Sequence, residues 1–474
     1  MTHATSRRAF LKHAALCAAA GPAAAPFALN LATLAAMSSV SGAAQAQSVA
    51  GYKALVCVFL FGGNDSYNTV VPYDTTSYNA YSVARSTAPD PIALSQGTLL
   101  PLIPNTTQAS GRLAALHPNL GGLKTLFDAT RLAVVSNVGP LIRPTTKTQY
   151  NARSVTLPPR LFSHNDQQNT WQAFAPEGAS YGWGGRMGDL LMSSNTNTIF
   201  TCISAAGNAV WLSGQSALQY QVSNSGAIQI AGLGSTPLFG SSVASAQLRS
   251  IITNTGGTNL LEREHGRIVG RSVNAETSLT AAIGSSSTFT TALPASNSLA
   301  NQLQVVARII NARAALGTSR QVFFVSLGGF DTHDLQNTSH ATLMTRLNAA
   351  LVYFDSLLGE MAATDSQIRQ KVTLFTASDF GRTLTSNGDG TDHGWGAHHF
   401  VMGGAVRGKD IYGTLPEVGT NTPDEVGQGR LLPSLAVDQY GATLAKWFGL
   451  SAGQISTVFP NIGNFAVSDL NFLT

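Results

Sequence analysis

The segment GTDHGWGAHHF, residues 390–400, places one aspartate and three histidines within eight positions. These side chains are Asp392, His393, His398 and His399. The whole chain has ten histidines, so three of them in one short segment is an uneven distribution. Imidazole nitrogens and carboxylate oxygens are the donors that Zn²⁺, Mn²⁺ and iron take in proteins. The composition of this segment therefore indicates a metal site.

Side chains of the same kinds follow three apolar runs that are typical of buried strands. The runs cover residues 54–61, 321–327 and 371–377, and each is rich in β-branched and aromatic residues. In open parallel sheets, ligands bind at the carboxyl ends of the strands. The polar residues just beyond these ends are therefore the candidates: Asn64, Asp65 and Ser66, then Asp331 and His333, then Asp379 and Arg382.

Each of these side chains also has an ordinary structural interpretation. An aspartate that follows a strand commonly caps a turn or a helix, and this applies to Asp65 and Asp379. Asp331 and His333 could form a hydrogen-bonded turn. Residues 387–392, NGDGTD, resemble a calcium loop, but Asp392 stands where that loop needs glycine. The recurrence of acids and imidazoles at three strand ends favours one shared metal site.

The spacing of apolar residues between the strand-like runs predicts helices. Leucines and other apolar residues recur at intervals of three and four over 343–361, and a similar pattern covers 299–310. Residues 132–139 and 399–406 are candidates for further strands. The alternation of strand and helix predicts an α/β fold with a doubly wound, mostly parallel sheet and helices on both faces.

Residues 1–46 have the pattern of an export signal. Arg7 and Arg8 precede an alanine-rich apolar run that ends in the small-residue sequence AQA. A membrane anchor is the alternative, but glycine and proline interrupt the run before about 18 apolar residues accumulate. The pattern predicts twin-arginine export and cleavage near Ala46. The mature chain would be periplasmic or extracellular, with no stable membrane span.

Removal of this segment lowers the 28 basic side chains to 25, against 24 acidic ones. The net charge then falls from +4 to +1, which gives no argument for a nucleic-acid partner. Residues 47–474 are predicted to form a single α/β domain, with a Ser/Thr/Gly-rich insertion or subdomain at about 190–295. Two cysteines remain, Cys57 and Cys202, and the sequence leaves open whether they pair.

Five motifs resemble those of the domain of unknown function 1501 family, whose members are mostly exported bacterial proteins. The motifs are FLFGGNDSYNTVVPYD, SHNDQQNTWQ, GGFDTHDLQ, SDFGRTLTSNGDGTDHGWGAHHFVMGGAVRGKDIYG and DQYGATLAKWFGL. The resemblance covers nearly all of the predicted mature chain and is weakest around 200–295. That family in turn resembles the alkaline phosphatase and sulfatase superfamily, which has a doubly wound α/β sheet and two metal ions.

The resemblance implies a role for each candidate residue. One or two divalent ions, Zn²⁺, Mn²⁺ or similar, would be held by Asp65, Asp331, His333, Asp379, Asp392, His393 and His398. Ser163 stands at a predicted helix start, where the superfamily has its nucleophile and where a helix cap is the alternative role. Arg382 would bind the ester oxygens or form a salt bridge at a helix start. Phe380 departs from the superfamily pattern, which has histidine at that place.

Two functions follow from these expectations. The first is an exported metal-dependent hydrolase of phosphate or sulfate esters, acting on a small-molecule ester or a polymer. The second is a non-catalytic exported binding or structural protein that keeps the fold and a structural metal. His398 and His399 would point to opposite sides of a strand, so at most one can join the site. His399 precedes an apolar stretch and is expected to be structural, with both ring nitrogens satisfied.

Overall fold

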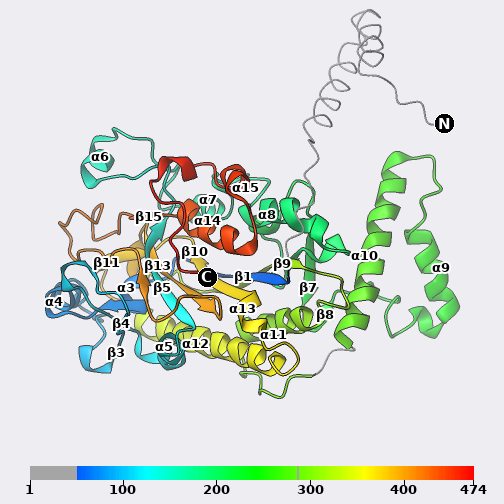
Figure 1. Ribbon diagram of the computed structural model, residues 1–474, viewed down its shortest axis with the longest axis horizontal. Helices are drawn as coiled ribbons and strands as arrows, with labels where there is room; N and C mark the ends of the chain where they lie inside the picture. Colours follow the sequence, from blue (N-terminus) through cyan, green and yellow to red (C-terminus); the bar gives the residue numbers. More distant parts are fainter. Residues whose placement is uncertain (1–50, 285–287) are drawn as a thin grey trace, which may run out of the picture. The chain divides into compact units, whose positions relative to one another are not determined.

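Three strands of almost continuous apolar sequence lie side by side at the centre of a large sheet (Figure 1). β1 (Lys53–Phe61) pairs in parallel with β9 (Arg320–Gly328) on one side and with β10 (Val372–Ser378) on the other. Nearly all of their side chains are buried, which is the environment that strands of a covered parallel sheet require. The computed structural model describes residues 51–284 and 288–474, so the export signal predicted at 1–46 lies outside the described residues.

The full sheet has the order β14-β5-β13-β10-β1-β9-β6-β7-β8, and β15 pairs with β5. β13 and β8 run antiparallel to their neighbours, and the other strands run parallel to β1. The sequence-based prediction of a mostly parallel α/β sheet is therefore confirmed. The other strands of the main sheet are β5 (Leu132–Gly139), β6 (Cys202–Ser204), β7 (Gln219–Ser223), β8 (Gly226–Ala227), β13 (Ala397–Gly403), β14 (Ile411–Tyr412) and β15 (Leu435–Ala436). One small sheet contains β2 (Val70–Pro72), β3 (Leu100–Pro101) and β4 (Ala114–Leu116). A second contains β11 (Arg382–Ser386) and β12 (Thr391–His393).

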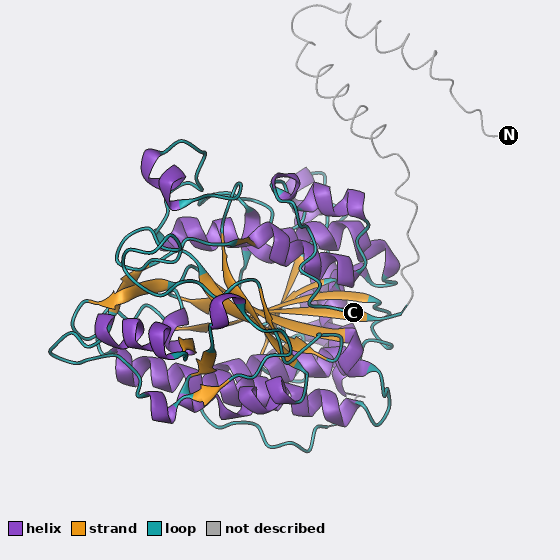
Figure 2. Ribbon diagram, turned by 60° about the vertical axis from the view of Figure 1, so that its left-hand side comes forward, coloured by secondary structure: helices purple, strands orange, loops and turns teal. Residues whose placement is uncertain are grey.

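Helices cover both faces of the sheet (Figure 2). One face carries α5 (Gly121–Asp128), α11 (Ser298–Asn311) and α12 (Gln336–Met361). The opposite face carries α7 (His164–Ala173), α8 (Trp183–Leu191), α14 (Val437–Phe448) and α15 (Ala452–Val458). The remaining helices are α3 (Ser66–Thr69), α4 (Thr75–Ala84), α6 (Lys147–Ala152), α9 (Ser242–Ile252), α10 (Leu260–Gly284) and α13 (Ile368–Lys371).

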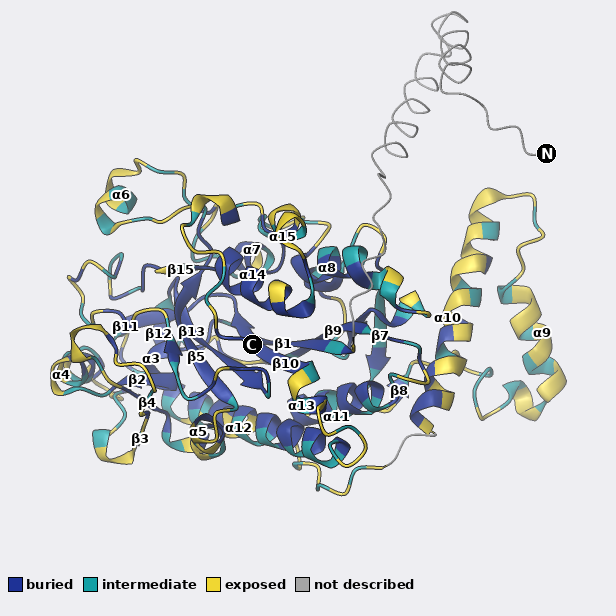
Figure 3. Cartoon of the chain, in the orientation of Figure 1, coloured by how far each residue is buried: buried dark blue, intermediate teal, exposed yellow. Residues whose placement is uncertain are grey.

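The alternation of side chains along β1 divides the interior into two layers. Val56 and Val58 belong to one apolar cluster with the leucines of α11 and α12, while Phe59 faces the opposite layer and contacts the ring of Phe324 at 6.1 Å. That second layer is rich in aromatic rings, such as Trp183 and Phe375 at 5.5 Å. Figure 3 shows the buried sheet between these helices. The strands are therefore fixed from both sides, and so are the positions of their ends.

The region at about 190–295 contributes strands to the main sheet and then continues as helices. β6 and β7 extend the main sheet beyond β9, and α9 and α10 follow with largely exposed surfaces (Figure 3). Among the described residues, no helix is both long and apolar enough to span a membrane.

Cys57 and Cys202 are free and buried. They lie on β1 and β6, which are separated by β9, so their backbones are roughly 10 Å apart. A disulfide requires Cα atoms within about 7 Å. The open question of their pairing is therefore answered by the order of the strands.

The three central strands end together. Phe61 is in register with Gly328, and Leu60 is in register with Ser378. β1 then turns through Gly62, whose φ of 115° lies in the region that favours glycine. A side chain there would be 2.4 Å from the backbone nitrogen of Asp331, so glycine allows the loops after β1 and β9 to touch.

Replacement of Gly62 by alanine should be strongly destabilising. Gly111→Ala is the matched control, because Gly111 also has a positive φ, 67°, but has open space where a Cβ would lie. We expect the control to lower the free energy of unfolding by about 1 kcal/mol. Gly62→Ala should cost roughly 3 kcal/mol or more, because the clash with backbone atoms adds to the strain. Urea denaturation of both variants measures the difference, and equal losses would contradict the prediction.

Candidate metal centre

Donor side chains from three parts of the chain converge just beyond the ends of the central strands. Asp331 follows β9, His393 ends β12, and His164 begins α7. One ligand atom from each of these residues lies within 4.8 Å of the other two. His333 stands beside them on the exposed side, with its Nε2 2.9 Å from His393 Nε2 and 3.1 Å from Asp331 Oδ1.

The rings of His393 and His164 are both held through Nδ1. Nδ1 of His393 lies 2.7 Å from the carbonyl oxygen of Phe162, and a carbonyl can only accept, so this nitrogen carries the proton. Nδ1 of His164 lies 2.7 Å from a carboxylate oxygen of Asp379. In the neutral rings the Nε2 atoms are then the lone-pair donors, which is the usual arrangement of histidine ligands.

The Nε2 of His164 is the most informative single atom of the site. It is buried and has no hydrogen-bond partner among the described residues. It lies 3.3 Å from Oδ2 of Asp331. A buried polar atom without a partner is unusual in folded proteins and calls for an explanation, of which an ion is one.

Asp379 sets the orientation of His164. Its carboxylate is fully buried and accepts hydrogen bonds from the backbone N–H of Gly62 at 3.2 Å and from the side chain of Gln168 at 2.7 Å. The hydrogen bond to Asp379 raises the pKa of His164, whereas burial lowers the pKa of His393. The ring of Phe380 contacts both imidazoles, at 4.8 Å and 4.7 Å, and so forms an apolar wall behind them.

Arg382 holds the carboxylate of Asp331. Its buried guanidinium donates from Nη1 to Asp331 Oδ1 at 2.7 Å and to the carbonyl of Gly62 at 3.1 Å. Burial would raise the pKa of Asp331, but Arg382, together with His164 and His333, lowers it overall. Arg382 lies in β11 and not at a helix start, and its donors are directed to protein oxygens. It therefore orients the carboxylate.

A family model described as protein of unknown function, DUF1501, matches residues 52–433, which include every residue of this cluster. The chain belongs to the DUF1501 family. No curated protein matches the chain.

Solved structures resemble this DUF1501 protein only loosely. Ps i-CgsB in complex with k-i-k-neocarrahexaose is 10% identical over 87% of this chain and 77% of its own, with a TM-score of 0.35. The C-terminal periplasmic domain of EcEptC from Escherichia coli, in complex with zinc, is 11% identical over 86% and 85%, with a TM-score of 0.29. A mutant of the alkaline phosphatase PafA is 10% identical over 71% and 64%, with a TM-score of 0.27.

The other predicted ligands lie around or outside the cluster. Asp392 is 43% exposed, and its Oδ1 is 3.5 Å from Nδ1 of His333. Asp65 is fully buried and forms an ion pair with Arg85. His398 points to another part of the protein, where its Nδ1 accepts a hydrogen bond from the backbone of Asn137 at 3.1 Å, and burial lowers its pKa to about 4.

His399 and Ser163 differ in detail from the expectations. His399 packs against Trp171 at 4.9 Å, but its Nε2 has no hydrogen-bond partner among the described residues, so the ring is not fully satisfied. Ser163 occupies the N-cap position of α7 without accepting a backbone hydrogen bond. Its hydroxyl instead donates to Asp166 at 2.8 Å.

His164 was missed by the sequence-based reasoning, although it stands next to Ser163 in the motif SHNDQQ. The available signal was a histidine at a predicted helix start in a chain with few histidines. Arg85 was also missed, because an arginine at the end of a short helix gives no sign of its buried partner.

Proposed function

We propose that this DUF1501 protein is a metal-dependent hydrolase of phosphate or sulfate esters that acts after export from the cytoplasm. The observation that carries the proposal is the buried Nε2 of His164, which has no hydrogen-bond partner among the described residues and faces the carboxylate of Asp331 beside the Nε2 of His393. Two imidazoles and a carboxylate form a donor set that suits Zn²⁺ or Mn²⁺. The residues present therefore fit a divalent ion.

His164, Asp331 and His393 would hold the ion, and His333 would complete the set from the exposed side. When bound, the ion would act as a Lewis acid toward an ester oxygen. Asp331 and His333 are 44% and 42% exposed, so a substrate can reach this side of the cluster. On the other side, Phe380 and the buried Asp379 keep water away from the rings.

Loss of a ligand should abolish metal binding. We expect His164→Ala and His393→Ala each to weaken Zn²⁺ affinity by more than about 100-fold, because loss of a hydrogen-bond partner of a ligand alone costs 10–100-fold. His265→Ala is the matched control, since His265 is an exposed histidine on α10. Calorimetric titration and metal analysis of the purified mature protein measure binding, and a screen of phosphate and sulfate esters measures turnover.

The outcomes separate the two candidate functions. Turnover that needs the ion and is lost in both ligand variants supports the hydrolase. A bound ion without turnover of any ester supports the non-catalytic binding protein with a structural metal. Affinity unchanged in both variants would remove the metal centre and the hydrolase with it.

Attack on the ester would come from water or from Ser163, which immediately precedes His164. We expect Ser163→Ala to retain turnover, because the hydroxyl is engaged as a donor to Asp166. The substitution should lower the free energy of unfolding by about 1–2 kcal/mol, because it removes a hydrogen bond to a carboxylate. Complete loss of turnover, with metal content and folding intact, would instead identify Ser163 as the nucleophile.

Export by the twin-arginine route is supported by the sequence of residues 1–46 alone. Replacement of both Arg7 and Arg8 by lysine should leave uncleaved precursor in the cytoplasm, because the paired arginines are the recognition element of such signals. Cell fractionation and N-terminal sequencing of the wild-type protein, expected to begin near residue 47, measure this. Normal export of the double variant would exclude the route.

A further inference from the structure

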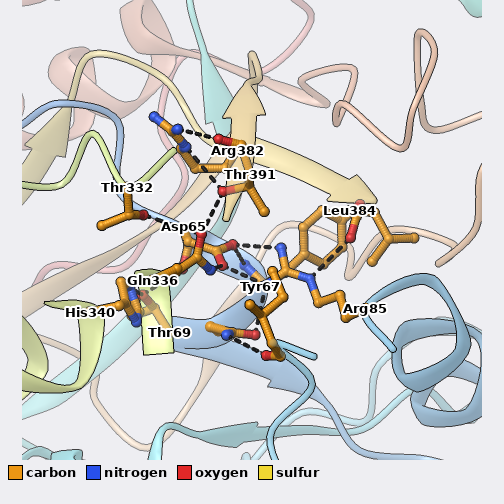
Figure 4. Close-up of polar contacts among 12 residues, drawn as sticks. Asp65, Tyr67, Thr69, Arg85, Thr332, Gln336, His340, Arg382, Leu384 and Thr391 are labelled. Atoms are coloured by element: carbon orange, nitrogen blue, oxygen red, sulfur yellow. Dashed lines mark hydrogen bonds and ion pairs between the residues drawn. The ribbon is translucent and has the colours of Figure 1, made fainter. Parts of the chain in front are cut away.

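Asp65, which the sequence places among the metal ligands, forms an ion pair with the guanidinium of Arg85. Its Oδ1 accepts from Nη2 of Arg85 at 2.9 Å and its Oδ2 accepts from Nη1 at 2.5 Å, and both side chains are fully buried (Figure 4). The same guanidinium donates to the backbone carbonyls of Thr383 at 2.9 Å and Leu384 at 3.1 Å. Arg85 therefore ties Asp65 to β11, the strand that begins with Arg382.

A line of hydrogen bonds runs from Asp65 to Arg382 (Figure 4) and continues from Arg382 to the metal centre. Gln336 donates from Nε2 to Asp65 Oδ2 at 2.6 Å. Thr391 donates its hydroxyl to Gln336 Oε1 at 2.7 Å and accepts from Arg382 Nε at 3.1 Å. Arg382 then donates to Asp331 at 2.7 Å.

We infer that Asp65, Gln336 and Thr391 are positioning residues for the metal centre, and that the chain holds one metal ion. The three residues act through Arg382, whose guanidinium they keep against Asp331. The guanidinium of Arg85 stands where a second cation would have to bind Asp65. This inference rests on the proposed metal site, and it changes the role of Asp65 from ligand to support.

The direction of the bonds explains why the line is rigid. Each hydroxyl or amide in it donates toward Asp65 and accepts from the side of Arg382, so no group can turn without breaking two bonds. Gln336, Thr391 and Arg382 have no exposed surface, and water cannot replace a broken bond there. These bonds consequently fix the orientation of the Arg382 guanidinium, and with it the position of the Asp331 oxygen that accepts from it.

Thr391→Val tests the positioning role, because valine keeps the shape of threonine and removes only the hydroxyl. We expect Zn²⁺ affinity to fall by up to about 10-fold, the low end of the range for direct hydrogen-bond partners of metal ligands, because Thr391 acts through Arg382. We also expect the visible absorption spectrum of the Co²⁺-substituted protein to change, because the carboxylate of Asp331 would be held differently. Thr391→Ser, which restores the hydroxyl, should recover both the affinity and the spectrum.

A buried threonine far from the site controls for lost stability. The hydroxyl of Thr443 on α14 is buried and donates to the carbonyl of Gln439 at 2.9 Å. Thr443→Val should therefore lower stability without altering Zn²⁺ affinity or the Co²⁺ spectrum. If Thr391→Val does not fold, Gln336→Met breaks the same line at its next member and takes its place.

Metal analysis of the wild-type protein tests the stoichiometry. One Zn²⁺ per chain, unchanged in Asp65→Asn, supports the inference, and two per chain would overturn it. Unchanged affinity and spectrum in Thr391→Val would overturn the positioning role alone. A wild-type protein that binds no Zn²⁺ refutes the proposed function. In that case a metal-free crystal structure of Thr391→Val tests the positioning role. Displacement of Arg382 from Asp331 supports the role, and an unmoved Arg382 overturns it.

Discussion

One residue, Gly62, connects the two halves of the site. The N–H of Gly62 donates to Asp379, which orients His164, and the carbonyl of Gly62 accepts from Arg382, which holds Asp331. Because both bonds are made by the same residue, the end of β1 fixes the spacing between the histidine and the carboxylate. The convergence of donors thus depends on a backbone approach that only glycine permits, at an edge where three strands stop in register.

Much of the fold follows from sequence patterns that report burial. The runs at 54–61, 321–327 and 371–377 correspond to β1, β9 and β10 within one residue, and the periodic pattern over 343–361 falls within α12. Such segments are readable because a strand covered on both faces must be apolar throughout. Charged side chains inside the protein leave no comparable pattern, and the partner of Asp65 was therefore not foreseen.

The candidate site was predictable where its residues follow strands or, like His393, belong to the histidine-rich segment 390–400. Asp331 and His333 come directly after β9, and the structure places them beside His393, as the strand ends suggest. His164 belongs to α7, which covers the face of the sheet opposite α12. Only the packing of α7 over the sheet brings the His164 ring to Asp379. His398 belongs to an antiparallel strand whose direction no local pattern reveals, so its side chain could not be assigned to a face in advance.

The separation of Cys57 and Cys202 has a consequence for the conditions in which this protein can fold. Burial raises the pKa of Cys57 and raises that of Cys202 to about 12, so neither thiol ionises readily at neutral pH. Their strands keep them too far apart to join. The core therefore forms without oxidation of these two thiols, and both thiols are buried away from an external oxidant. The described part of the chain therefore folds without a disulfide between Cys57 and Cys202, whatever the redox state of its surroundings.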